Sequence, residues 1–183
     1  MEDRQTWKGR HHGDNKRNQT DALQEAEINA SFSVLGIGNI LLKDDGAGVR
    51  ALELLQTRGL PGNIRLVDVG TTIYHTMGII SEAEKLIVLD AVRLDNAPGT
   101  VYKFDSEEFK SKIPRKASSH EMGVLDALSI LRLSGQNVPE VVIIGVEPKE
   151  YGSWGEELSP EVSASVPAMA DKAMEQLKSW GAI

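Results

Sequence analysis

Short apolar runs rich in β-branched residues alternate with longer segments of helical periodicity, from about residue 32 to the end of the chain. The short runs have no polar face, which is typical of strands buried on both sides in a parallel sheet. Turn-forming residues separate them from the segments that follow. The pattern predicts strands at residues 32–36, 64–68, 86–90, 101–104 and 141–146.

Between these runs, apolar residues recur at the spacing that places them on one face of a helix. In the first such segment, Val49, Leu52 and Leu55 lie three residues apart. In the last, Ser159 is a good N-cap and Pro160 suits the first helical turn. The pattern predicts helices over residues 46–56, 72–81, 120–133 and 160–180.

Buried strands that alternate with helices predict an α/β fold. We expect a three-layer sandwich, in which a mainly parallel, twisted sheet is flanked by helices on both faces. A chain of 183 residues with 40% hydrophobic content is long enough for one domain with a substantial core but short for two. The prediction is a single α/β domain over residues 29–183.

Residues 1–28 mix charged residues, Gly, Asn and Gln with few aliphatic side chains. Such a segment cannot bury enough apolar surface to offset its chain entropy, so we expect a disordered polar tail. The pair His11 and His12 within it is interpreted as solvated, without a metal-binding role. The tail also lacks the apolar stretch of a secretory signal.

Composition excludes several classes of protein. A net charge of -7 argues against a protein that binds nucleic acid by neutralising phosphates. Without cysteine, the chain has no disulfide, thiolate metal site or cysteine nucleophile, so any metal must be bound by His, carboxylate or backbone oxygen. Its apolar runs are far shorter than the roughly 20 residues that cross a bilayer. We expect a cytoplasmic protein without a membrane span, and its oligomeric state is left open.

Acidic residues follow or end three of the predicted strands. Asp44 and Asp45 follow the first strand, Asp68 ends the second and Asp90 ends the third. Functional sites in parallel sheets form beyond the carboxyl ends of the strands, so these carboxylates should converge. Convergent carboxylates repel one another unless a cation or a shared proton offsets the repulsion, and a metal ion is the simplest such cation. His120, at the predicted start of a helix, would complete a mixed nitrogen and oxygen site.

Each of these residues also has an ordinary structural explanation. Asp44 or Asp45 can cap the helix that follows. Asp68 and Asp90 can bond to nearby backbone amides, as loop residues often do. A single histidine at a helix start is more often structural, and His75 is assigned a surface or packing role. The site hypothesis depends on the coincidence of all these residues at strand ends.

Motifs of other enzyme classes are absent or incomplete. The turn at Gly36 and Gly38 looks like the start of a dinucleotide-binding motif, but the third glycine is missing and the apolar residues 40–42 follow. An NAD-linked oxidoreductase is therefore not expected. We interpret the two glycines as allowing a sharp turn and a close approach to a bound peptide or metal. No Gly-x-Ser-x-Gly or His-Glu-x-x-His motif occurs, so a hydrolase here must act by other means.

Several ordered motifs make the sequence similar to a known family. Residues 36–50, GIGNILLKDDGAGVR, closely resemble the opening motif of the nickel-iron hydrogenase maturation endopeptidases. The later blocks DVGT, DAV, NAPGT, SHEMG and GVEP also resemble those of the family and occur in the same order. The resemblance covers about residues 32–179, which is essentially the whole predicted domain.

The resemblance implies an endopeptidase that removes a short C-terminal extension from the precursor of a hydrogenase large subunit after nickel insertion. The metal-contacting positions of the family fall on Asp45, Asp90 and His120, which are also catalytic candidates. Asp68 matches the acidic residue of the second block, with a catalytic or a supporting role. Some relatives carry Glu at the position of Asp45, so the side chain that would reach the metal is one methylene shorter in this sequence. Nickel is expected to come with the substrate, and the free enzyme need not carry it.

Two further points stay open from sequence. A non-catalytic nickel chaperone or assembly factor for hydrogenase maturation would use the same three ligands. Specificity is expected in the loop around His120 and in residues 149–158, where Tyr151 and Trp154 are candidate contacts for the partner protein. Packing in the core is the alternative role for both aromatic residues.

Overall fold

The computed structural model describes residues 31–112 and 119–183, so the predicted polar tail lies outside the described residues. These residues form a five-stranded sheet with the strand order β2-β1-β3-β5-β4. Neighbouring strands are parallel except for β4, which runs antiparallel to β5 at the edge. The strands are β1 (Phe32–Ile37), β2 (Ile64–Gly70), β3 (Lys85–Ala91), β4 (Val101–Asp105) and β5 (Glu140–Val146). The predicted mainly parallel sheet is confirmed.

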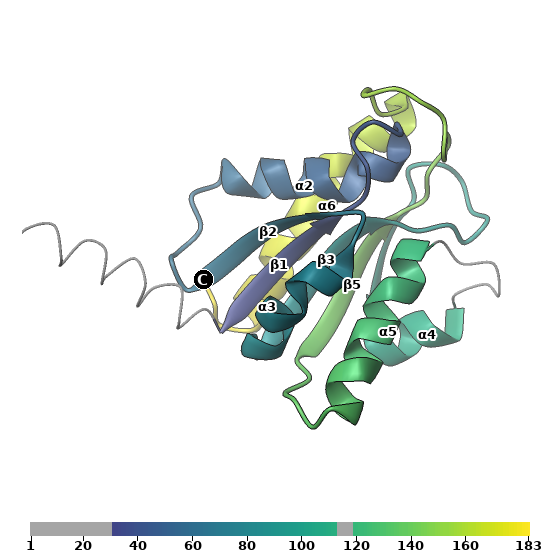
Figure 1. The fold of residues 1–183 in the computed structure, drawn as a ribbon. Coiled ribbons are helices and arrows are strands. Elements are labelled where there is room, and N and C mark those ends of the chain that lie inside the picture. Colours follow the sequence, from purple (N-terminus) through teal and green to yellow (C-terminus); the bar gives the residue numbers. More distant parts are fainter. Residues whose placement is uncertain (1–30, 113–118) are drawn as a thin grey trace, which may run out of the picture.

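Helices cover both faces of the sheet (Figure 1). The helical segments, with η for a 3-10 helix, are η1 (Asp44–Gly46), α2 (Ala47–Gln56), η2 (Ile73–Thr76), α3 (Met77–Glu82), α4 (Ser106–Lys112), α5 (Ser119–Leu133) and α6 (Pro160–Ser179). All four predicted helices are present, and the first two begin with a 3-10 turn. The short α4 was not predicted, because Phe109 is its buried residue and one apolar position gives no periodicity. In the described residues, no helix has the length and apolar content to cross a membrane.

Each strand contributes side chains to apolar clusters on both sides of the sheet. In β1, Val34 belongs to the cluster that includes α2 and α6 residues, whereas its neighbour Leu35 belongs to the cluster that includes α5 residues. Successive side chains of a strand point to opposite faces, so both sides of β1 are covered. This explains why the strands lack a polar face, and it confirms the three-layer α/β sandwich.

The order in which strands are added to the sheet reverses between the parallel strands β1 and β3. From β1 the chain crosses through α2 to β2 on one side, and from β2 it returns through α3 to β3 on the other side of β1. Ligand sites of open α/β sheets form at such a switch point. The start of α2 lies directly on it, because a Cβ at Gly48 would be 2.2 Å from the Leu89 carbonyl oxygen and 2.4 Å from that of Ile37.

The C-terminal residues lie at the opposite, amino edge of the sheet, beside the start of β1 (Figure 1). The Phe32 ring stacks with Trp180 at a centroid distance of 6.5 Å. The Asn63 side-chain amide donates a hydrogen bond of 3.5 Å to the Ala182 carbonyl oxygen. The end of the described chain is therefore held away from the switch point.

Candidate active site

Asp45 lies in η1, the turn that follows β1 and leads into α2. Its side chain is buried, and its Oδ2 accepts a hydrogen bond of 2.8 Å from the Asn39 backbone amide. Gly38 allows this close turn: its φ is +131°, and a Cβ there would be 1.8 Å from the Asp45 carbonyl oxygen. The predicted sharp turn is confirmed, and the group that Gly38 approaches in the structure is the backbone at Asp45. An approach to a bound peptide or metal stays a prediction.

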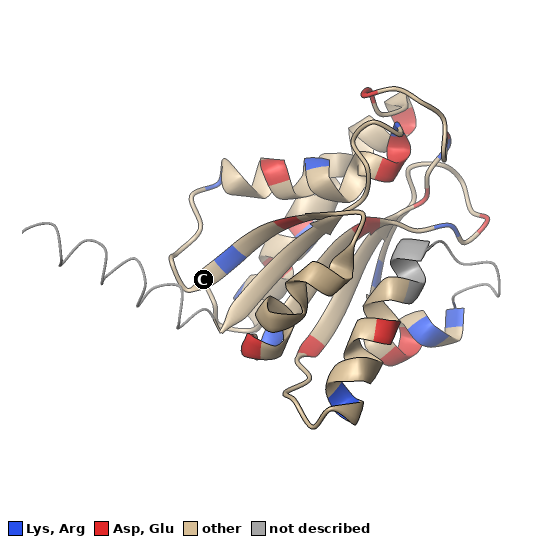
Figure 2. Cartoon of the chain, in the orientation of Figure 1, with Lys and Arg blue, Asp and Glu red and all other residues tan. Residues whose placement is uncertain are grey.

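Asp90 lies near the end of β3, next to β1 in the sheet. Its side chain is 1% exposed, and its Oδ1 accepts a hydrogen bond of 2.8 Å from the Ala91 amide. The turn η1, which carries Asp45, contacts β3. The fold thus brings both buried carboxylates to the switch point, as predicted from their positions at strand ends. Figure 2 shows acidic residues gathered at this carboxyl edge of the sheet.

Asp68 lies on β2 at the same edge, but its side chain is exposed. Its Oδ1 accepts a hydrogen bond of 2.9 Å from the Gly70 amide. This is the bond to a nearby backbone amide that the structural interpretation of Asp68 predicts. Asp68 also lines a cavity of about 260 Å³ together with Asn39 and Ile40. Because Asn39 binds Asp45, this cavity adjoins the turn that carries the buried carboxylate. The choice between a catalytic and a supporting role for Asp68 stays a prediction.

His120 belongs to the first turn of α5, and its side chain lies outside the described part of the structure. One turn later, a Cβ at Gly123 would be 3.2 Å from the Ile73 side chain, so the start of α5 packs on the segment that follows β2. In the described side chains, no group of three His, Cys, Asp or Glu residues is arranged to hold a metal ion. The triad of Asp45, Asp90 and His120 therefore stays a prediction. His75 is exposed, as expected for a surface role.

Asp44 does not cap the helix that follows it: neither η1 nor α2 has a side-chain hydrogen bond at its N-cap. It is fully buried, and its Oδ2 accepts hydrogen bonds from the backbone amides of Lys149, at 2.9 Å, and Glu150, at 2.7 Å. The Ser159 amide and hydroxyl donate to the two carboxylate oxygens at 2.7 and 2.8 Å. The capping interpretation is wrong for Asp44, which joins the β1–α2 turn to the segment 147–159.

The same contact corrects the interpretation of Ser159. Ser159 is the N-cap residue of α6 and Pro160 follows it in the first turn, as predicted. However, its side chain makes no capping hydrogen bond, because the hydroxyl donates to Asp44. The two loops are therefore joined at the point where α6 begins.

Glu147 is a buried acidic residue whose role was not predicted from the sequence. It follows β5 directly and is 5% exposed. Its Oε2 accepts hydrogen bonds from the Leu94 amide, at 2.9 Å, and from the Tyr102 hydroxyl, at 2.6 Å. Glu147 thus fixes the loop that leaves β3 just after Asp90. Its position directly after a buried strand, in the GVEP motif, is the sequence signal that marks it.

The hydrogen bond between Tyr102 and Glu147 should affect how stability changes with pH in alkaline solution. Burial, together with the hydrogen bond to the Glu147 carboxylate, raises the pKa of the Tyr102 phenol to about 12. A tyrosine in the unfolded chain has a pKa of about 10. The contribution of Tyr102 to the stability of the fold is therefore complete below pH ~10 and is lost as the pH rises through about 12. In urea unfolding at increasing pH, we expect the free energy of unfolding to fall less steeply in this window for Tyr102→Phe than for the wild type. Tyr74→Phe, at an exposed position, serves as the control; equal slopes for all three proteins would contradict the assignment.

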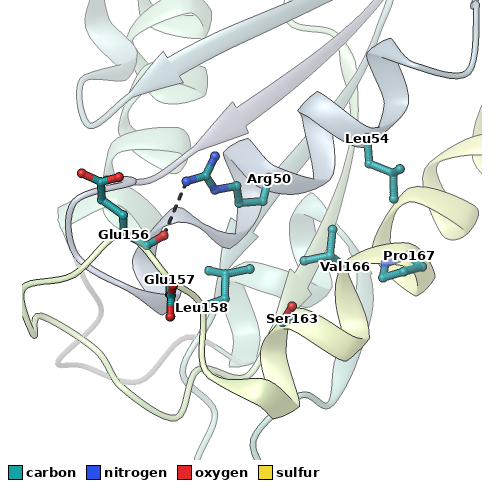
Figure 3. A pocket seen from close by; sticks show the side chains of 8 residues that line it. All are labelled: Arg50, Leu54, Glu156, Glu157, Leu158, Ser163, Val166 and Pro167. Atoms are coloured by element: carbon teal, nitrogen blue, oxygen red, sulfur yellow. Dashed lines mark hydrogen bonds between the residues drawn. The ribbon is translucent and has the colours of Figure 1, made fainter.

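A second cavity, of about 520 Å³, lies between α2, α6 and the loop that precedes α6 (Figure 3). Its lining residues are Arg50, Leu54, Glu156, Glu157, Leu158, Ser163, Val166 and Pro167. None of the predicted site residues lines it. The Arg50 guanidinium donates a hydrogen bond of 3.4 Å to the Glu156 carbonyl oxygen, which ties this loop to α2.

Solved structures with the same fold define the class of protein. The hydrogenase maturating endopeptidase HybD from E. coli superposes with a TM-score of 0.76 and 34% identity, covering 82% of this chain and 93% of that one. The NiFe hydrogenase maturation protease HybD from Thermococcus kodakarensis has a TM-score of 0.67 and 34% identity, covering 79% and 97%. The fold is thus that of an α/β class of hydrolases that act on peptide bonds.

Sequence comparisons identify the family. The family model described as hydrogenase maturation protease matches residues 49–176. The hydrogenase 2 maturation protease of Escherichia coli K12 is 37% identical over 148 residues, which are 79% of this chain and 86% of that protein. The hydrogenase expression/formation protein HupD of Rhodobacter capsulatus is 35% identical over 150 residues, 81% of this chain and 71% of that protein. The chain belongs to the hydrogenase maturation protease family, as the resemblance of its motifs implied.

Proposed function

We propose that this protein is the endopeptidase that removes a C-terminal extension from the precursor of a nickel-iron hydrogenase large subunit after nickel has been inserted. It recognises the nickel held by the substrate through Asp45, Asp90 and His120. The observation that carries the proposal is a pair of buried carboxylates, Asp45 in the turn after β1 and Asp90 near the end of the adjacent parallel strand β3. We expect the reaction in the cytoplasm.

Burial of two carboxylates at one switch point supports a role in binding a cation. Moving carboxylates out of water is costly unless hydrogen bonds or a positive charge compensate. Asp45 and Asp90 accept backbone hydrogen bonds from Asn39 and Ala91, which hold each carboxylate in place. A metal ion that arrives with the substrate would offset the remaining repulsion between them.

Nickel bound by the substrate is here part of the substrate. Carboxylate oxygens and an imidazole nitrogen suit open coordination positions on such an ion. Binding there would align the scissile peptide bond with the carboxyl edge of the sheet. The free enzyme need not carry the ion; it contributes the oxygen and nitrogen ligands and the cavity beside Asp68.

The test is cleavage of a nickel-loaded precursor by the wild type and by Asp45→Ala, Asp90→Ala and His120→Ala. Each substitution removes one proposed ligand, so we expect the cleavage rate to fall by about a hundredfold or more. Asp171→Ala, which removes an exposed acid paired with Arg58, is the matched control and should cleave normally. Mass spectrometry of the precursor before and after incubation measures the shortening. Normal processing by all three ligand variants would end the proposal.

The same experiment distinguishes the enzyme from a nickel chaperone or assembly factor. A non-catalytic binder would leave the mass of the precursor unchanged even with the wild-type protein. Repeating the incubation with nickel-free precursor tests recognition of the metal, because the proposal expects little shortening of that substrate. Equal cleavage with and without nickel would contradict nickel recognition and leave the endopeptidase activity standing.

A further inference from the structure

Three exposed apolar side chains lie on two loops beside the candidate active site. Trp154 is 79% exposed, Leu41 is 45% exposed and Ile40 is 38% exposed. We name these three residues the apolar rim. Ile40 and Leu41 lie in the β1–α2 turn that also carries Asp45, and Trp154 lies in the segment between β5 and α6. Large apolar side chains that are exposed together often mark an interaction surface.

Backbone hydrogen bonds hold the two loops of the rim side by side. The Gly155 amide donates to the Leu41 carbonyl oxygen at 2.9 Å, and the Lys43 amide donates to the Gly155 carbonyl oxygen at 2.7 Å. Lys43 also forms an ion pair with Glu150. Trp154 therefore stands next to Leu41 on a fixed backbone.

The segment that carries Trp154 is also fixed at other points along its length. Asp44 binds its two ends, at Lys149 and at Ser159. The Arg93 guanidinium lies 4.7 Å from the centroid of the half-buried Tyr151 ring. An exposed tryptophan on a preorganised loop costs little entropy to bind, and such residues commonly dominate interface energetics.

We propose that the apolar rim docks the folded body of the precursor protein, separately from the contacts that the cleaved tail makes at the carboxylates. This inference rests on the proposed function, because the substrate is a folded protein. The rim is continuous with the site through the turn that carries Ile40, Leu41 and Asp45. A protein whose tail reaches Asp45 would therefore bring its folded body close to the rim.

Charge defines the chemistry of the complementary surface. Glu156 and Glu157 are exposed and follow Trp154 after one glycine, and the whole chain carries a net charge of -7. The loop with its acidic residues is visible above α6 in Figure 2. The precursor surface that fits the rim is an apolar patch bordered by Lys and Arg, because opposite charges around an interface guide association and register.

The test measures binding of nickel-free precursor, so that nickel contacts cannot contribute. We compare the wild type, Trp154→Ser, Leu41→Ser and the control Leu133→Ser, which changes an 89% exposed leucine at the far end of α5. We expect Kd to rise about tenfold or more for the two rim variants and to stay unchanged for the control. Added salt should weaken wild-type binding, because exposed charges contribute.

Cleavage of nickel-loaded precursor gives a second readout. For the rim variants, KM should rise about tenfold while kcat stays within about twofold, because docking is lost and the carboxylates are intact. All three substituted positions are exposed, so the melting temperatures of the variants should match that of the wild type. Unchanged Kd and KM in both rim variants would overturn the inference.

Two other outcomes are distinguishable. If wild-type protein leaves the nickel-loaded precursor uncut while the rim variants still lose binding, the proposed function fails and the docking surface stands. If size-exclusion chromatography shows a wild-type dimer that Trp154→Ser converts to a monomer, with unchanged affinity for the precursor, the rim joins two copies of this chain and the inference is wrong.

Discussion

Asp44→Ala should destabilise the fold by about 3–5 kcal/mol, although Asp44 is not one of the three proposed metal ligands. The buried carboxylate accepts hydrogen bonds from the backbone amides of Lys149 and Glu150, and from the amide and the hydroxyl of Ser159. Removing it leaves these donors buried without their acceptor. Domains of this size have free energies of unfolding of about 5–15 kcal/mol, so the loss is a large part of the total. Denaturant unfolding followed by circular dichroism measures it.

Two comparisons separate this effect from a general loss of charge. Asp44→Asn keeps the shape and one acceptor oxygen, so we expect a smaller loss of about 1–3 kcal/mol. Asp171→Ala removes an acid in an exposed ion pair with Arg58 and should change stability by less than about 1 kcal/mol. If Asp44→Ala were as stable as Asp171→Ala, the assigned joining role would be wrong.

Gly48→Ala should prevent close packing of α2 on the sheet, with a loss of about 3 kcal/mol in the free energy of unfolding. The added Cβ would meet the carbonyl oxygens of Leu89 and Ile37 at 2.2 and 2.4 Å, and both are backbone atoms that cannot rotate away. Alanine favours helices over glycine by about 1 kcal/mol, which is too little to offset the clash. Thermal and denaturant unfolding measure the change.

Gly78→Ala is the matched control for this prediction. Gly78 also lies in a helix, α3, but it is exposed and an added Cβ there would have no atom within 4 Å. The helix preference should then prevail, so this variant should be as stable as the wild type or more stable by up to about 1 kcal/mol. Equal responses at Gly48 and Gly78 would show that the start of α2 tolerates displacement from β1 and β3.

The sequence predicted the sheet because the apolar pattern that specifies it is local. Val34 and Leu35 enter opposite cores, so the strands could be recognised as buried on both faces. The antiparallel direction of β4 could not be predicted, because it depends on pairing with β5, whose residues lie far along the chain. The short α4 was missed since its burial depends on Phe109 alone.

For the site, position relative to strands was predictable and hydrogen bonding was not. Asp45 and Asp90 could be placed at one edge because Asp45 follows one recognisable strand and Asp90 lies near the end of another. The role of Asp44 depends on Ser159, 115 positions away, and no local pattern distinguishes it from a cap. The two consecutive acids Asp44 and Asp45 look equivalent in sequence, yet the fold gives them different partners.

The position of the C-terminal residues at the amino edge has a practical consequence for immobilised assays. Trp180 and Ala182 are anchored beside Phe32 and Asn63, across the sheet from the switch point. A biotin or fluorescent label attached after Ile183 would therefore project away from an incoming protein. A sensor surface coupled at that end presents the carboxyl edge of the sheet outward.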